Sequence, residues 1–202
     1  MRNQVQLSPK RMDQVMRNLF TGVVIFFATT MVDAQESKRP PVSEKPFSMM
    51  QKLNVLEGRW AMVTEITQDD GNTWQAMPAS EVVIQLRHKG MILAEVPADT
   101  STPGFHMETY ITYDQYRKVF RKAAIDDVWG IMDLYEGTFQ EDAIVFDNVA
   151  SGTTFPIAKG VWRNFRLRLE LKSPERKFLI EKSDDAGQTW QPSFRITYSL
   201  LN

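Results

Sequence analysis

Two histidines are the residues of this chain most suited to acid–base or metal chemistry. His88 continues the apolar face of residues 82–86 and could line a cavity, although such a histidine more often lies at a strand end. His106 and Glu108 are two residues apart, so on a strand they would share one face. One histidine and one carboxylate fall short of the three or four protein ligands of a zinc site. We therefore predict no metal.

Carboxylates are paired at Asp126-Asp127 and occur within two similar segments, 67–75 and 183–191. Neighbouring strand residues point to opposite faces, so Asp126 and Asp127 suit a turn better than an acid–base pair. Both segments fit Ser/Thr-x-Asp-x-Gly-x-Thr-Trp, which resembles the Asp-box of sialidases and related propellers. A propeller repeats its unit in every blade, and this chain has two copies. We predict two β-hairpins and no catalytic residue.

Composition excludes several classes of function. The chain has 202 residues, a formal net charge of −1 and no cysteine. A nucleic-acid partner would need a basic face, and none is indicated. Disulfides, thiolate metal sites and cysteine nucleophiles are impossible, and no glycine-rich phosphate loop follows a strand. We expect no cofactor.

The first residues have the pattern of an export signal. Basic residues precede an apolar run at 19–32, about 14 residues long, which is short of the roughly 20 that span a bilayer. Small residues then favour cleavage between Ala34 and Gln35, with an uncleaved membrane anchor as the alternative. We predict that 1–34 is a secretion signal peptide and that the protein is periplasmic or secreted, without a stable membrane anchor after cleavage. Translation could begin at Met1, Met12 or Met16.

The rest of the chain divides into a tether and one domain. Three prolines among polar residues predict an exposed, extended tether over 35–48. The domain, 49–202, opens with a short helix for which Ser48 is a suitable cap and which ends before Gly58.

Strict alternation of apolar and polar residues follows, most clearly at 81–87, 164–172 and 194–200. Period two with one polar face is typical of half-buried antiparallel strands. Turn residues at short intervals indicate about nine or ten strands, which suits a barrel or a sandwich. We predict an all-β fold, an antiparallel up-and-down β-barrel with a short N-terminal helix.

Gly58-Arg59-Trp60 on the first strand and Arg195 on the last are similar to the signature of the calycin superfamily, the lipocalins and their relatives. In that resemblance the guanidinium lies across the indole and closes one end of the barrel. Motifs over 113–139 resemble a bacterial family of uncharacterised lipocalin-like proteins. Their distant relatives, the nitrobindins, hold ferric haem through a histidine near the C-terminus. No histidine follows His106 here, so the resemblance argues against haem.

A barrel of this kind has a small internal cavity, and we expect it to bind a small, largely apolar ligand. His88, Tyr113 and Met132 are the predicted ligand contacts, whereas Gly58, Trp60 and Arg195 are predicted to be structural. Two alternatives stay open: an enzyme acting on a small apolar substrate in the cavity, and a protein-interaction module without a ligand. The sequence does not indicate the oligomeric state.

Overall fold

A short helical segment precedes the sheet. The structure, a computed structural model, describes residues 43–101, 103–172 and 175–201. Helix α2 spans Lys45–Gln51 and is followed by a 3-10 turn, η1, at Asn54–Leu56. Proline is tolerated in a first helical turn because its missing N–H would have no partner there, so Pro46 fits this start. Ser48 does not cap the helix but lies inside it, with its hydroxyl donating to Lys45 O at 2.9 Å. The helix therefore begins within the predicted tether.

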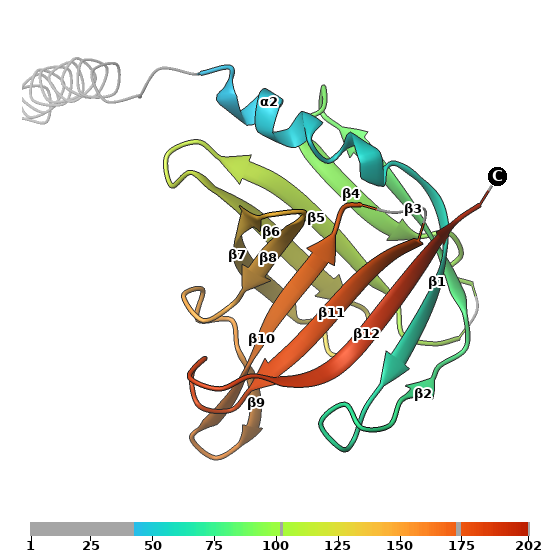
Figure 1. Cartoon of the computed structure of the whole chain (residues 1–202), viewed down its shortest axis with the longest axis vertical. Coiled ribbons are helices and arrows are strands. Elements are labelled where there is room, and N and C mark those ends of the chain that lie inside the picture. The colour runs from blue at the N-terminus through green and yellow to red at the C-terminus, as the bar shows by residue number, and fades with distance from the viewer. Residues whose placement is uncertain (1–42, 102, 173–174, 202) are drawn as a thin grey trace, which may run out of the picture. The chain divides into compact units, whose positions relative to one another are not determined.

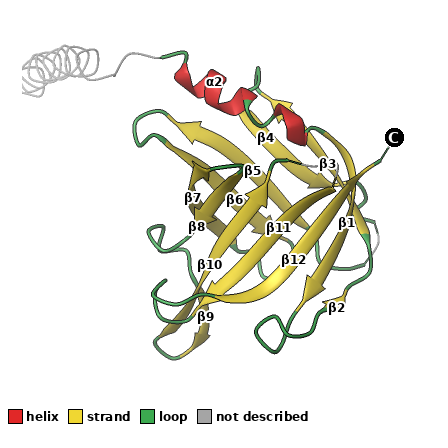
Figure 2. Cartoon of the chain, viewed as in Figure 1, coloured by secondary structure: helices red, strands yellow, loops and turns green. Residues whose placement is uncertain are grey.

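The part of the chain that the structure describes contains twelve strands, most of them joined to the next by a short connection (Figure 2). Their bounds are β1 Gly58–Ile66, β2 Gln75–Ala76, β3 Ser80–Arg87, β4 Ile92–Pro97, β5 Met107–Asp114, β6 Val119–Asp126, β7 Met132–Gln140, β8 Ala143–Asp147, β9 Phe155–Ala158, β10 Val161–Glu170, β11 Glu175–Ser183 and β12 Gln191–Leu200.

Ten of these strands form a closed antiparallel barrel, as the alternation predicts. Each barrel strand pairs with its neighbours in chain order, β12 pairs with β1, and pairing of β10 with β11 closes the ring. The short strands β2 and β9 lie outside the ring, against β1 and β10. Figure 1 shows the strands wound around a common interior.

Side chains in register share one face of the sheet, so one inward residue identifies the others. Ile84 pairs with Glu95, Glu95 with Thr109, and Thr109 with Ala124. Aromatic residues fill much of the interior; Phe120 and Phe146 are almost completely buried. Opposite Phe146 the chain has Gly137, where an added Cβ would lie 2.3 Å from the phenyl ring. The absence of a side chain at Gly137 thus makes room for Phe146.

The helical segment lies at one end of the barrel (Figure 1), where Met50, Leu53 and Leu56 are buried in the core. Trp60 donates its indole N–H to Leu56 O at 2.9 Å. The Arg176 guanidinium from β11 stacks over Trp60, 4.8 Å from the ring centroid. It also donates to the backbone carbonyls of two residues at this end, Val55 and Leu171.

Arg176 therefore takes the place that the calycin resemblance assigned to Arg195, and that prediction is wrong. Ile196 and Tyr198 face inward on β12, so alternation turns Arg195 outward. There it forms an ion pair with Glu65 and stacks over Trp74 at 4.4 Å. Gly58 and Trp60 do lie at the closed end: a Cβ at Gly58, whose φ is +144°, would lie 2.8 Å from Leu200 and 3.3 Å from the indole of Trp60.

The two Asp-box segments form matching turns, between β1 and β2 and between β11 and β12. In the first turn Thr67 Oγ1 accepts from Gly71 N at 2.9 Å, and Asp69 Oδ1 accepts from Thr73 N at 2.8 Å. The second turn repeats these bonds with Ser183, Asp185, Gly187 and Thr189. Both aspartates are engaged within their turns, which confirms the hairpin interpretation.

Replacing Arg176 should destabilise the barrel more than replacing Arg195. Arg176→Met leaves two carbonyls at the closed end without their charged donor, and we expect a loss of about 1–3 kcal/mol in the free energy of unfolding. Arg195→Met breaks a pair whose arginine side chain is 46% exposed and screened by solvent, so its loss should be clearly smaller than that of Arg176→Met. Urea denaturation followed by tryptophan fluorescence measures both. Equal losses would contradict the assignment of Arg176 as the closing residue.

Candidate functional site

Of the three predicted ligand contacts, one faces the interior. His88 is exposed in the turn between β3 and β4, with a φ of 51°, so the chain reverses before the inward face of β3 can reach it. Met132 faces outward at the start of β7 and is 55% exposed. The expectation that these two line the cavity is wrong. Tyr113 is buried and lies edge-on to Phe120, with ring centroids 5.1 Å apart; its contact with a ligand stays a prediction.

At the end of the barrel opposite α2, hydrogen bonds join His106 to Asp127. His106 Nδ1 lies 2.8 Å from Asp127 Oδ2, and the same carboxylate accepts from the His106 backbone N–H. These bonds lower the pKa of Asp127. Asp126 accepts from the backbone N–H groups of Val128 and Trp129, which confirms the predicted turn. No group of three or more potential metal ligands occurs among the described residues.

The largest concentration of chemically active groups lies inside the barrel, and we call it the inner polar cluster. It comprises Glu95 on β4, Lys122 on β6, Asp133 and Tyr135 on β7, and Tyr198 on β12. Register places these side chains inward: Glu95 pairs with Ile84, and Lys122 with Ile111 and Tyr135. Lys122 is only 5% exposed. Lysine is almost never buried to this degree without a partner.

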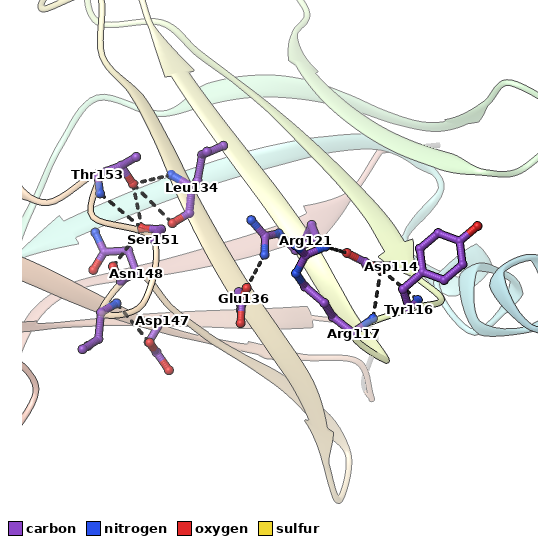
Figure 3. A network of polar contacts seen from close by, with 11 residues as sticks. Asp114, Tyr116, Arg117, Arg121, Leu134, Glu136, Asp147, Asn148, Ser151 and Thr153 are labelled. Atoms are coloured by element: carbon purple, nitrogen blue, oxygen red, sulfur yellow. Dashed lines mark hydrogen bonds and ion pairs between the residues drawn. The ribbon is translucent and has the colours of Figure 1, made fainter. Parts of the chain in front are cut away.

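One half of the cluster is fully hydrogen-bonded. Asp133 accepts from Tyr135 Oη at 2.5 Å, from Asn148 Nδ2 at 3.0 Å and from Thr153 Oγ1 at 2.7 Å. Figure 3 shows Asn148, Ser151 and Thr153 gathered beside Leu134 on β7, where Thr153 also accepts from the Leu134 N–H. A buried carboxylate with this many donors is compensated for the loss of water. The Asp133 carboxyl group is therefore held in place by its donors.

The other half is under-bonded. Tyr198 Oη donates to Glu95 Oε1 at 3.2 Å. Lys122 Nζ has no hydrogen bond and no ion pair within 4.0 Å to any residue that the structure describes, and its nearest recorded contact is the Tyr135 ring, 5.5 Å from the centroid. Glu95 Oε2 likewise has no hydrogen-bond partner among the described residues.

These two atoms border a space that water can enter. Among the described residues, one side-chain polar atom is both inaccessible to solvent and without a hydrogen bond. This atom is Nε of Arg176. Lys122 Nζ and Glu95 Oε2 also lack partners, so each must retain accessible surface. Several apolar residues that pack against the core are only partly buried as well: Met62, Met107, Phe165 and Ile180. The interior therefore contains space beside the under-bonded half of the cluster.

Burial dominates the electrostatics of the cluster. It raises the pKa of Glu95, against the opposing effects of the Lys122 charge and the Tyr198 hydrogen bond. It lowers the pKa of Lys122 to about 8, although Glu95 and Asp133 act in the opposite direction. Burial together with the neighbouring carboxylates also raises the pKa of Tyr135 and Tyr198. Lys122 can thus donate or take up a proton close to neutral pH, beside a Glu95 carboxyl group whose pKa is shifted upward.

A second hollow, of about 200 Å³, lies on the outer surface of β4–β7. Ile92, Tyr110 and Leu134 line it. These residues alternate with inward ones, so the hollow faces solvent and is separated from the inner polar cluster by the sheet. Its lining carries almost no polar surface. Two of its side chains have a shifted pKa: that of Tyr110 is raised by a hydrogen bond to Glu108, and that of Lys122, which faces inward, is lowered by burial.

Fold and site together define a small closed β-barrel with a polar cluster inside an otherwise apolar interior. The chain belongs to a family of proteins of unknown function (DUF1579), whose family model matches residues 45–199. No curated protein matches it. Among the described residues, no helix is long and apolar enough to cross a membrane.

Sequence reasoning missed the inner polar cluster. On β6, Phe120, Lys122 and Ala124 alternate with Val119, Arg121 and Ala123, so each face carries one cation and neither is clearly apolar. A signal was available in the sequence of β6. A large aromatic residue such as Phe120 is expected to face the core, and the period of two then turns Lys122 inward as well. Glu95 follows Leu93 on β4 in the same way.

Burial of the Lys122 ammonium should make stability depend on pH. In the unfolded chain the ammonium persists up to its ordinary pKa of 10.5, whereas in the fold it persists only to about 8. The cost of burying it is therefore complete below pH 8 and disappears as pH rises toward 10.5. Relative to Lys122→Met, wild type should carry a penalty of about 3 kcal/mol at pH 7 that falls to about 1 kcal/mol at pH 10.

Urea denaturation of both proteins between pH 7 and pH 10 measures this difference. The range stops at the ordinary pKa of tyrosine, about 10, above which Tyr135 and Tyr198 would be mostly ionised in the unfolded chain of both proteins. Lys159→Met is the matched control, because Lys159 is exposed in the turn between β9 and β10. A penalty that does not change with pH would mean that Lys122 is not desolvated in the folded protein.

Proposed function

We propose that the barrel binds a small, largely apolar ligand whose single polar group is held by Lys122 and Glu95. The observation that carries this proposal is the pair of under-bonded atoms, Lys122 Nζ and Glu95 Oε2, beside accessible space in an apolar interior. An unpaired buried charge costs several kcal/mol, and a ligand atom that completes its hydrogen bonds recovers part of that cost. A carbonyl, carboxylate or hydroxyl oxygen would accept from the ammonium.

The end opposite α2 suits the approach of an apolar molecule. The exposed Phe105 and Trp129 form an aromatic row there with the partly buried Phe155, with ring-centroid separations of 5.8 Å and 6.1 Å. They come from the β4–β5 loop, the β6–β7 loop and β9. Large aromatic residues exposed together are typical of binding surfaces. An apolar ligand could contact this row before it enters the barrel.

Ligands of equal length and different head groups test the proposal. We expect wild type to bind a medium-chain alcohol, aldehyde and carboxylic acid more tightly than the matching alkane. Lys122→Met should weaken binding of the oxygen-bearing ligands by roughly tenfold, the value of a hydrogen bond to a charged group, and leave alkane binding unchanged. Displacement of an anilinonaphthalene fluorophore measures the affinities.

Lys159→Met serves as the matched control and should bind like wild type. Native mass spectrometry of the purified protein would add the mass of any ligand that co-purifies. If wild type binds none of the oxygen-bearing ligands, or if Lys122→Met binds all of them as tightly as wild type, the inner polar cluster is not the ligand site.

We further propose kinship with the calycins and export from the cytoplasm. Kinship is supported by the arginine–tryptophan stack at the closed end, although Arg176 on β11 supplies the arginine. Export is supported by residues 1–34, which lie outside the described part of the chain. When the full chain is expressed in a bacterium, the protein should be recovered from the periplasm or the medium. Its mass should be that of a chain whose first residue is Gln35. A cytoplasmic protein that retains residues 1–34 would contradict export.

A further inference from the structure

We propose that Lys122 forms a reversible imine with an apolar aldehyde held in the barrel. The inference rests on the proposed function, since the aldehyde has to occupy the same interior space, and it identifies the carbonyl group as the head that the cluster selects. Three features carry it: an amine with no partner among the described residues, an apolar enclosure, and a neighbouring carboxyl group that can exchange a proton.

The amine is free to react. A structural lysine at 5% exposure would be expected to hold an ion pair, yet Lys122 Nζ has neither ion pair nor hydrogen bond to a described residue. Its surface borders the accessible interior space, so a carbonyl carbon can reach the nitrogen. The Tyr135 ring, at 5.5 Å, limits the ammonium on one side.

The groups that face Lys122 come from three other strands. Glu95 lies on β4, Asp133 and Tyr135 on β7, and Tyr198 on β12. Asp133 is engaged by three donors and Tyr198 donates to Glu95, so Glu95 is the carboxyl group with a free oxygen. No ion pair joins Glu95 to Lys122 within 4.0 Å, so this carboxyl group does not occupy the ammonium directly.

The reaction balances without an oxidant or a reductant. Nζ, as the neutral amine, attacks the carbonyl carbon; a C–N bond forms and the π electron pair moves to oxygen, which takes a proton from the nitrogen. The resulting carbinolamine loses its hydroxyl group as water, using a proton from the Glu95 carboxyl, and a protonated imine remains beside the Glu95 carboxylate. Overall, one amine and one aldehyde give one imine and one water.

Desolvation favours this lysine over the others of the chain. At pH 7.4 an amine of pKa about 8 is free in about a fifth of molecules, on the order of 100-fold more than an ordinary lysine. The apolar interior also retards hydrolysis of the imine by limiting access of water.

Reductive trapping tests the inference on the whole protein. Wild type is incubated with an equimolar medium-chain aldehyde and cyanoborohydride, and the products are weighed and digested. We expect a single adduct with the mass of the aldehyde less one oxygen atom, located on Lys122. Labelling of Lys122 should exceed that of Lys159 by at least tenfold at pH 7.4, and its rate should rise with a midpoint near pH 8.

Lys122→Met should lose the adduct, whereas Lys159→Met should keep it. If Lys122→Met does not fold, competition with the alcohol of equal length serves as the control. The alcohol should occupy the site in wild type and protect Lys122 from labelling by the aldehyde. Labelling of Lys122 no greater than that of Lys159, in a protein that still binds the alcohol, would overturn the imine and leave the proposed function intact. Binding of neither the aldehyde nor the alcohol would overturn both.

Discussion

Closure of the sheet between β10 and β11 fixes which side of every strand faces the interior. A closed ring has no free edge along which the pairing could slip, and a shift of one residue would turn a whole row of side chains over. All side chains on the inward side of a strand are therefore buried together, whatever their chemistry. Phe120 and Lys122 illustrate this on β6: burying the phenyl ring brings the ammonium inside with it.

The polar interior divides into a compensated and an uncompensated half. Asp133, with donors from Tyr135, Asn148 and Thr153, resembles a structural anchor that fixes the segment after β8 against β7. Lys122 and Glu95 are left with unused hydrogen-bonding capacity. Because the two halves are neighbours, Asp133 also acts on Lys122 and opposes the lowering of its pKa by burial. The compensated half thus supports the uncompensated one electrostatically.

The sequence allowed the architecture to be predicted because alternation and turn residues are local signals. Phe165, Leu167 and Leu169 alternate with polar neighbours, so their strand could be recognised on its own. The site could not, since β6 carries a cation on each face and only tertiary packing decides between them. At the closed end, alternation with Ile196 and Tyr198 turns Arg195 outward. The register of β11 against β12, which pairs Arg176 with the inward Tyr198, decides that Arg176 reaches Trp60.

The two ends of the barrel have different chemistry. One end is shut by buried residues of α2 and η1 and by the Arg176–Trp60 stack, whereas the other carries the aromatic row and the hydrogen-bonded Asp-box turns. Replacing an under-bonded buried ion with an apolar side chain of similar volume commonly stabilises a protein. Lys122 is therefore a poor choice for stability alone, and such local conflicts concentrate at functional positions. The ammonium is best explained by a partner that reaches it from the aromatic end.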